Sequence, residues 1–170
     1  MHKLHRKAYG VWALMKNRCY NEKLKDMRKS YSGVTVCDEW MIFDNFKHWF
    51  IENYINGSQI DKDAVSPGNT IYSPSTCCFV TRHINILLPG RKAISNKLTG
   101  ITPAKNGFNV KVSNRYSHYE FKGIKTLEGA IKKYRETKLS VIRLEAKLAY
   151  SNKEISKTTY QHLINWNFPD

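Results

Sequence analysis

The stretch from residue 60 to residue 88 constrains the fold of this chain more than any other part of the sequence. It begins beside the carboxylate of Asp61, continues through a loop rich in Gly, Asn, Ser and Pro, and reaches the apolar run 77–80. A short apolar run bounded by turn residues is typical of a buried strand. A helix-compatible segment that carries His83 and Asn85 follows. We therefore predict a strand–loop–strand–helix unit, which can bring an acid of its first strand against a polar side chain of its helix.

Two amphipathic segments on the N-terminal side are predicted to pack around this unit. Apolar side chains recur every three to four residues from residue 6 to residue 19, which indicates a helix. Aromatic side chains fall on one side of a second predicted helix at residues 42–54. The β-branched segment 34–37 predicts a short strand between them. We assign the large aromatic side chains to the core, where such residues are most often found.

A change of pattern at residues 89–99 divides the chain. This segment is polar and basic, begins with Pro89-Gly90 and is predicted to be a linker. A chain of 170 residues can hold one ordinary domain or two small ones. The sequence therefore predicts an α+β protein in two parts. Residues 1–88 form a helix-wrapped strand–loop–strand–helix domain, and residues 100–170 form a three-stranded antiparallel sheet with helices.

The strongest local signal in the second part is Asn106-Gly107, which lies between short apolar segments and predicts a tight hairpin. Three antiparallel strands are expected between residues 101 and 121. Alternation along the middle strand places Val110 and Val112 on one face of the sheet. The opposite face is predicted to carry four basic or polar side chains: Lys105, Asn109, Lys111 and Arg115.

Two helices are predicted to close the chain. Thr126 is a good N-cap and begins a long helix that reaches about Tyr150. Ser151 or Asn152 is expected to begin a final helix near residues 153–165.

Charge is the main compositional constraint on function. The chain holds 28 Lys or Arg against 14 Asp or Glu, a formal net charge of +14. Most of the excess lies in residues 91–170, with 16 Lys or Arg against 6 Asp or Glu. Because such an excess repels itself in a compact state, it indicates a polyanionic partner.

The sequence also bears on the cellular location of the protein and on a structural metal site. No apolar run approaches the roughly 18 residues of a membrane span, and no uninterrupted apolar stretch follows the basic N-terminus as in a secretory signal. We therefore expect a cytoplasmic protein with no membrane partner. The four cysteines suit a reducing compartment. Cys77 and Cys78 would point to opposite faces of a strand and no Cys-x-x-Cys pair is present, so buried thiols are favoured over a structural Zn²⁺ site that uses Cys19, Cys37 and Cys77.

Residues 100–138 resemble the apetala-type DNA-binding domain of plant ethylene-response factors, a domain that also occurs in phage nucleases. The resemblance covers the order of strands and helix, the helix entry Thr126-Leu127-Glu128-Gly129-Ala130 and Tyr134 within the helix. It implies a sheet that lies in a groove of double-stranded DNA, where strands as well as helices fit. The alternative is a structural sheet whose polar face is simply solvated.

Residues 76–85 resemble the second half of an HNH nuclease motif, and Asp61-Lys62 falls where that family carries Asp-His or His-His. Upstream segments strengthen the likeness: residues 15–21, 36–40 and 72–74. The ordered set is similar to phage-borne HNH proteins, often of homing-endonuclease type, with an apetala-type tail. The resemblance spans about residues 6–165, and it implies a ββα-metal unit in the first part and a host-cell cytoplasmic location if the gene belongs to a phage.

The resemblance implies metal-assisted hydrolysis of a phosphodiester bond. Carried over by position, Asp61 and Asn85 are the metal ligands, and their oxygen atoms suit Mg²⁺ or Mn²⁺. The position of the general base is occupied by Lys62, and the central Asn position by Thr76; both depart from the family pattern. A lysine is a poor base unless its pKa is strongly lowered.

Three alternatives follow from the lysine. In the first, Lys62 serves as an electrophilic phosphate clamp. In the second, His83 serves as the base, although His83 and Asn85 are two residues apart on a helix and so do not share a face. In the third alternative the site is degenerate. The charged residues 61–63 would then form only a local turn, and Asn85 would brace a loop.

The sequence thus predicts an HNH-type endonuclease of double-stranded DNA. Arg82 is predicted to contact DNA in addition to the four basic or polar side chains of the sheet. The alternative is a catalytically inactive DNA-binding protein that retains a nuclease-like core.

Overall fold

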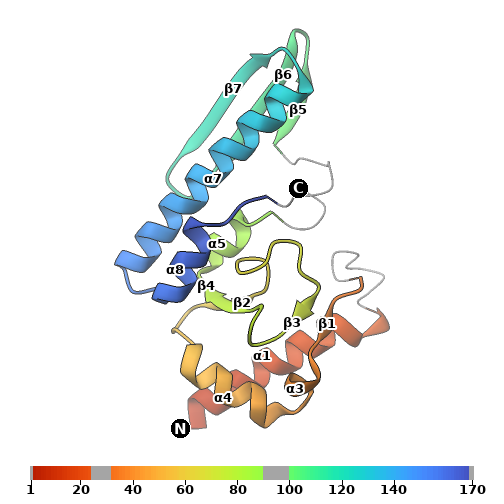
Figure 1. Cartoon of the computed structure of the whole chain (residues 1–170), viewed down its shortest axis with the longest axis vertical. Helices are drawn as coiled ribbons and strands as arrows, with labels where there is room; N and C mark the ends of the chain where they lie inside the picture. Colours follow the sequence, from red (N-terminus) through yellow and green to blue (C-terminus); the bar gives the residue numbers. More distant parts are fainter. Residues whose placement is uncertain (1, 24–31, 90–99, 169–170) are drawn as a thin grey trace.

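The computed structural model describes residues 2–23, 32–89 and 100–168. They form an elongated α+β molecule with three small sheets (Figure 1). In chain order the elements are α1 (His2–Tyr20), β1 (Thr35–Val36), α3 (Asp38–Met41), α4 (Phe43–Asn53), β2 (Gln59–Asp61), β3 (Ile71–Tyr72), β4 (Cys78–Val80), α5 (Arg82–Leu87), β5 (Ile101–Ala104), β6 (Gly107–Ser113), β7 (His118–Ile124), α7 (Leu127–Ser151) and α8 (Lys157–Ile164). Helices α1 and α4 occupy one end, the three-stranded sheet occupies the other, and α7 runs from the sheet into the middle.

The N-terminal helices confirm the predicted helical segments with two changes. Helix α1 covers the predicted segment 6–19 and begins earlier, at His2. The predicted helix 42–54 is preceded by the short helix α3, because Ile42 has an extended backbone (φ −89°, ψ 118°) that interrupts the two. Helices α1 and α4 pack together over aromatic side chains that include the fully buried Trp40, Phe46 and Phe50. Their assignment to the core is therefore confirmed.

The predicted strand–loop–strand–helix unit is present as β2, β4 and α5. Strand β2 pairs antiparallel with β4, with Gln59 opposite Val80 and Asp61 opposite Cys78. The Thr81 hydroxyl caps α5 by accepting the backbone N–H of Ile84 at 3.2 Å. The long loop between β2 and β4 contains β3, which the sequence analysis did not predict and which pairs parallel with β1.

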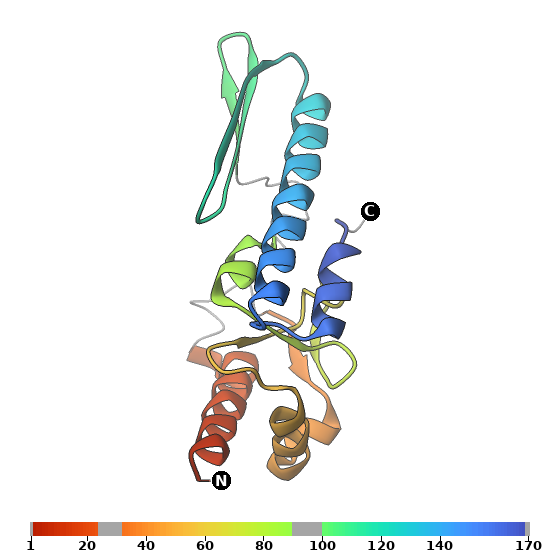
Figure 2. The same cartoon turned by 90° about the vertical axis from the view of Figure 1, so that its left-hand side faces the viewer.

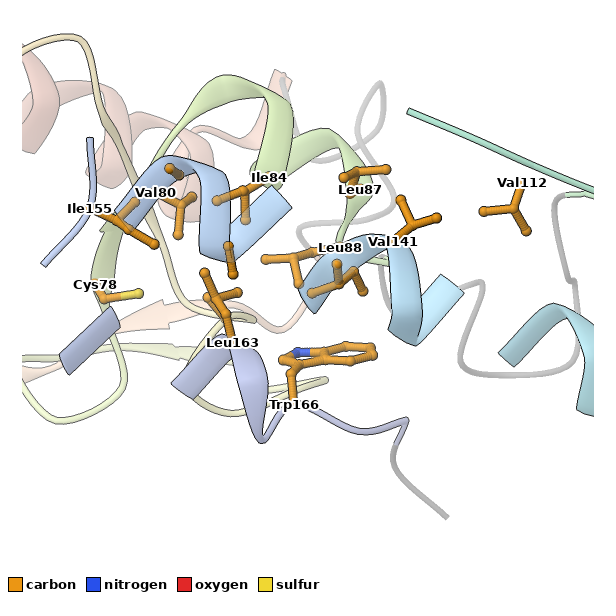
Figure 3. Packing of buried hydrophobic residues seen from close by; sticks show 14 of the residues in the cluster. Cys78, Val80, Ile84, Leu87, Leu88, Val112, Val141, Ile155, Leu163 and Trp166 are labelled. Carbon is orange, nitrogen blue, oxygen red and sulfur yellow. The ribbon is translucent and has the colours of Figure 1, made fainter. Parts of the chain in front are cut away.

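The β2–β4 pair separates two hydrophobic clusters. Successive side chains of a strand point to opposite faces of the sheet. The paired residues Ile60 and Phe79 therefore lie on the side of α1 and α4, while Cys78 and Val80 lie on the other side. On that second side Val80 packs with Ile84 of α5 and with residues of α7 and α8 (Figure 3).

The predicted three-stranded sheet is confirmed in the order β5–β6–β7, antiparallel throughout, but its last strand ends at Ile124, beyond the predicted limit of residue 121. Val110 and Val112 are buried against α7, and the intervening Lys111 is exposed, as the alternation predicts. Gly107 closes the β5–β6 turn at φ +129°, and a Cβ there would stand 2.2 Å from the carbonyl oxygen of Ile124. Only glycine fits this position. In Figure 2 the strands lie on one side of α7, and among the described residues no element covers their other face.

The C-terminal helices correct one boundary. Thr126 caps α7 as predicted, by accepting the N–H of Gly129 at 3.1 Å. The predicted restart at Ser151 or Asn152 is wrong: Ser151 is the last residue of α7 and Asn152 is its C-cap. Helix α8 begins later, where the Ser156 hydroxyl accepts the N–H of Thr159 at 3.0 Å.

One core joins the two predicted parts of the chain. Residues 90–99 of the predicted linker lie outside the described residues. The larger hydrophobic cluster draws Val80, Ile84 and Leu87 from one side of that segment and Val141 and Leu163 from the other (Figure 3). Within the described ranges, no helix is both long enough and apolar enough to span a membrane.

Candidate acidic site and nucleic-acid interface

Asp61 ends β2 and caps the turn that follows it. One carboxylate oxygen, Oδ1, accepts the backbone N–H groups of Asp63 at 2.9 Å and of Ala64 at 2.7 Å. Such a local bond is the usual way in which an aspartate stabilises a turn. The side chain is buried, and burial raises the pKa of Asp61 from its ordinary value of 3.8 to about 6. The charge of Asp63 adds to this rise, whereas the two amide bonds oppose it.

Lys62, which occupies the predicted position of the general base, is also buried. Its Nζ donates to Oδ1 of Asp63 at 2.8 Å. The side chain is only 7% exposed, so the ion pair satisfies an ammonium group that has lost most of its water. Lys62 is therefore paired with Asp63, its neighbour in sequence, and is shielded from solvent.

Asn85 packs against the strand that carries Asp61. Its Nδ2 donates to Oε1 of Gln59 at 2.9 Å, and helix α5 contacts β2. Gln59 and Asp61 are two residues apart on the strand and so project from the same face. Among the described residues, Asp61 and Asn85 form no direct hydrogen bond with each other. The sequence analysis missed Gln59, which carries no motif signal of its own.

His83 and Arg82 lie at the start of α5 and are exposed. Asn85, two residues after His83, is half-buried, which agrees with the expectation that the two do not share a helix face. Thr76, at the predicted Asn position, has a structural role. Its hydroxyl donates to the carbonyl of Ile71 at 2.7 Å and accepts the N–H of Ser73 at 3.1 Å.

The donor chemistry of the acidic site is compatible with a hard cation. Asp61 and Asn85 supply oxygen atoms, and Mg²⁺ typically takes one or two carboxylates and completes its shell with water and substrate phosphate. In the part of the chain that the structure describes, no group of three or more His, Cys, Asp or Glu side chains is placed to hold a metal. A cation at this position would need further ligands from water or from a bound anion.

The neighbouring thiols are unreactive. Burial, with a smaller contribution from the charge of Asp61, raises the pKa of Cys78 to about 12. Burial raises the pKa of Cys77 as well. Both thiols are therefore protonated near neutral pH, and they behave as small apolar side chains.

The outward face of the three-stranded sheet is polar and holds a charge network. Lys111 Nζ lies 3.3 Å from Oε1 of Glu120, and Lys122 Nζ lies 3.7 Å from the same oxygen. The two lysines lower the pKa of Glu120, Lys111 most strongly. The Oδ1 atom of the half-buried Asn109 accepts the backbone N–H of Gly123 at 3.2 Å, a bond that does not use the amide N–H groups of Asn109. Lys105 is exposed in the β5–β6 turn, at one end of this face.

The prediction that Arg115 shares the outward face of the sheet is wrong, because its guanidinium is held by a buried acid of α7. Arg115 lies in the β6–β7 turn, and its Nη2 is 3.3 Å from Oε2 of Glu145, a side chain of α7 that is only 1% exposed. Neither Glu145 oxygen accepts a hydrogen bond within the described part of the chain, so Arg115 is the charge that compensates it. Sequence reasoning missed Glu145. An acid within the apolar stripe of an amphipathic helix could have indicated a buried charge that needs a partner.

Comparisons of the chain with protein-family models, with curated proteins and with solved structures give no match.

Proposed function

We propose that this protein binds double-stranded DNA through the outward face of the β5–β6–β7 sheet. The observation that carries the proposal is the alternation along β6, which buries Val110 and Val112 on α7 and turns Asn109 and Lys111 outward. The major groove admits β-strands as well as helices, and amide and ammonium groups such as those of Asn109 and Lys111 match base edges and phosphates. The charge excess of residues 91–170 supports a polyanionic ligand.

We further propose that the β2–β4–α5 unit gives the protein HNH-type endonuclease activity. The resemblance of residues 61–85 to the HNH motif supports this, and so do the strand order and the packing of Asn85 on β2. Asp61 and Asn85 would hold Mg²⁺ or Mn²⁺, which when bound supplies charge stabilisation for the departing oxygen. Arg82, exposed at the start of α5, is a proposed phosphate contact. No base for the attacking water is assigned, because His83 does not share a helix face with Asn85.

A second candidate function, DNA binding without hydrolysis, is favoured by the contacts of Asp61 and Lys62. The Asp61 carboxylate already accepts two backbone amides, and Lys62 is buried in an ion pair with Asp63. Both side chains thus have structural partners that do not require a metal or a substrate.

Duplex binding is tested by titrating a labelled duplex with the protein at several salt concentrations. We expect the logarithm of affinity to fall linearly with the logarithm of salt, because phosphate contacts release counterions. Substituting Lys111→Ala together with Lys122→Ala is expected to weaken binding and reduce this slope. An affinity and slope that equal those of the wild type would rule out the sheet as the binding surface. The two candidate functions then differ in whether supercoiled plasmid is nicked when Mg²⁺ or Mn²⁺ is present.

A further inference from the structure

Helix α1 lies at the end of the molecule remote from the three-stranded sheet (Figures 1 and 2). The helix is strongly basic. Its 19 residues include five Lys or Arg and no Asp or Glu. The helix buries Ala8, Met15 and Cys19 against the core, and it exposes Lys3, Arg6 and Lys7. Neither the acidic site nor the sheet accounts for this charge.

Aromatic rings gather on one flank of the same helix and meet the first residue of α4. Four ring pairs are within stacking or edge-to-face range: His5–Phe43 at 5.4 Å, Tyr9–Phe43 at 5.3 Å, Tyr9–Trp12 at 5.8 Å and Trp12–Phe43 at 5.4 Å. The spacing of His5, Tyr9 and Trp12 by four and three residues places them on one stripe of the helix. Together with Lys16 and Lys47 these residues form a surface that we call the aromatic–cation patch.

Two ammonium groups lie over the rings of the patch. Nζ of Lys16 is 4.3 Å from the ring centroid of Trp12, and Nζ of Lys47 is 5.8 Å from that of Phe43. Both distances allow a cation–π contact. Lys47 also pairs with Asp44 at the start of α4, whereas Lys16 belongs to a helix without acids.

The patch is accessible and its geometry is fixed in advance. Tyr9 is 53% exposed, although it belongs to the ring cluster. Trp12 is anchored from beneath, because its Nε1 donates to the carbonyl oxygen of Trp40 at 2.6 Å. Exposed aromatic faces beside ammonium groups are the arrangement that binds unpaired bases and their phosphates. A second copy of this chain is a poorer fit, because two α1 helices of like charge would repel each other.

We propose that the aromatic–cation patch binds single-stranded DNA, with a base stacked on Tyr9 and phosphates contacted by Lys16 and Lys47. This site is separate from the outward face of the sheet and does not depend on duplex binding there. Single-stranded DNA would be available wherever the two strands of a duplex are separated.

The test is titration of the full-length protein with a labelled oligothymidine of about 12 nucleotides, within the range of known single-strand sites. Tyr9→Ala is expected to weaken binding at least about fivefold, the lower limit for loss of one base stack. Tyr9→Phe keeps the ring and is expected to retain the affinity. Leu14→Ala removes a side chain of α1 that is 56% exposed but lies outside the patch, and it is expected to bind like the wild type.

Equal affinities for Tyr9→Ala and the wild type overturn the proposal. The proposal is also overturned if Tyr9→Ala changes only the sedimentation of the free protein, because that result identifies a contact between copies. Each variant is titrated with a blunt duplex in parallel. Loss of duplex binding in the Lys111→Ala, Lys122→Ala protein with retained oligothymidine binding separates the two sites. An oligothymidine affinity that falls with the sheet variant but not with Tyr9→Ala assigns both ligands to the sheet and rejects the patch.

Discussion

The carboxylate of Asp61 has one observed role and one proposed role. In the structure it closes the turn after β2 by accepting two backbone N–H groups, and in the proposed nuclease it would also hold a cation. Both uses are possible chemically, because a carboxylate has two oxygen atoms with several acceptor sites. The buried location makes the ionised form costly, and a bound cation would reduce that cost.

Substituting Asp61→Asn is expected to change how stability depends on pH. The folded-state pKa of about 6 lies above the ordinary value of 3.8, so the folded protein binds this proton more tightly than the unfolded chain. The contribution of protonated Asp61 to the free energy of unfolding is therefore fully present below about pH 4, and it is lost as pH rises through 6. Without metal, the wild type should lose on the order of 3 kcal/mol relative to Asp61→Asn across that interval.

The measurement is urea unfolding of both proteins in EDTA at several pH values. The Asn side chain can accept the same backbone bonds but does not titrate, so the difference between the two curves isolates Asp61. A difference that stays constant between pH 4 and pH 7 would contradict the raised pKa.

Arg115 is expected to stabilise the fold through Glu145. Removing one partner of a buried ion pair leaves an uncompensated charge, so Arg115→Ala should lower the free energy of unfolding by about 3 kcal/mol. Adding Glu145→Gln should recover most of that loss, because the buried charge is then gone. Thermal or urea unfolding of the wild type, the single variant and the double variant measures both effects. If the double variant is as unstable as Arg115→Ala, the pair is not the source of the stability.

Residue positions in the acidic site could be predicted from the sequence better than residue contacts could. The order of Asp61, the apolar run and Asn85 placed these residues on a strand, a strand and a helix, as observed. The bond from Asn85 to Gln59 joins residues 26 apart, and nothing local specifies it. The partner of Arg115 was equally hidden, because Glu145 lies 30 residues further along the chain.

At the scale of elements, the sheet is the best-predicted part of the molecule. Asn106-Gly107 and the alternation that follows are local signals, and they fix the turn and the faces occupied by the β6 residues Val110, Lys111 and Val112. The interruption at Ile42 and the start of α8 were not predicted. Several residues near each boundary can serve as caps, and the packing of the core selects among them.

Glu120→Gln is expected to tighten the binding of double-stranded DNA. Glu120 lies 3.3 Å from Lys111 and 3.7 Å from Lys122, so its carboxylate competes with phosphate for both ammonium groups. The exposed Glu52→Gln substitution on α4 makes the same change of net charge far from the sheet and is the control. Titration of a labelled duplex at low salt should show an affinity several-fold higher for Glu120→Gln than for Glu52→Gln. Equal gains in the two variants would indicate a general charge effect with no role for the sheet face.

At the scale of the whole molecule, the C-terminal residues complete the core of the β2–β4–α5 unit. Trp166 packs in the hydrophobic cluster beside Leu163 and Leu88 (Figure 3). Its side chain is 3% exposed, and its Nε1 donates to the carbonyl oxygen of Asp63 at 2.9 Å. This bond joins residues 103 apart and brings the C-terminal segment to the turn that holds Asp61. Such contacts could not be predicted from the sequence, which suggested a division near residue 90.

Trp166→Ala is expected to destabilise both halves together, by about 3 to 5 kcal/mol, the usual loss for a buried tryptophan. Circular dichroism and calorimetry should report a single shifted transition, because one hydrophobic cluster spans the two halves. Two separate transitions, with only one of them shifted by the substitution, would contradict a shared core. The exposed Leu144→Ala variant on α7 is the control and should unfold close to the wild type.

The most direct test of the proposed nuclease is incubation of the full-length protein with supercoiled plasmid in Mg²⁺ or Mn²⁺. Binding of the plasmid is measured in the same samples. We predict relaxed plasmid with the wild type, none in EDTA, and slower conversion by Asn85→Ala, whose partly exposed side chain can be removed with little loss of core. Plasmid that is bound yet stays supercoiled with either metal, or conversion that Asn85→Ala does not slow, would contradict the proposed metal site.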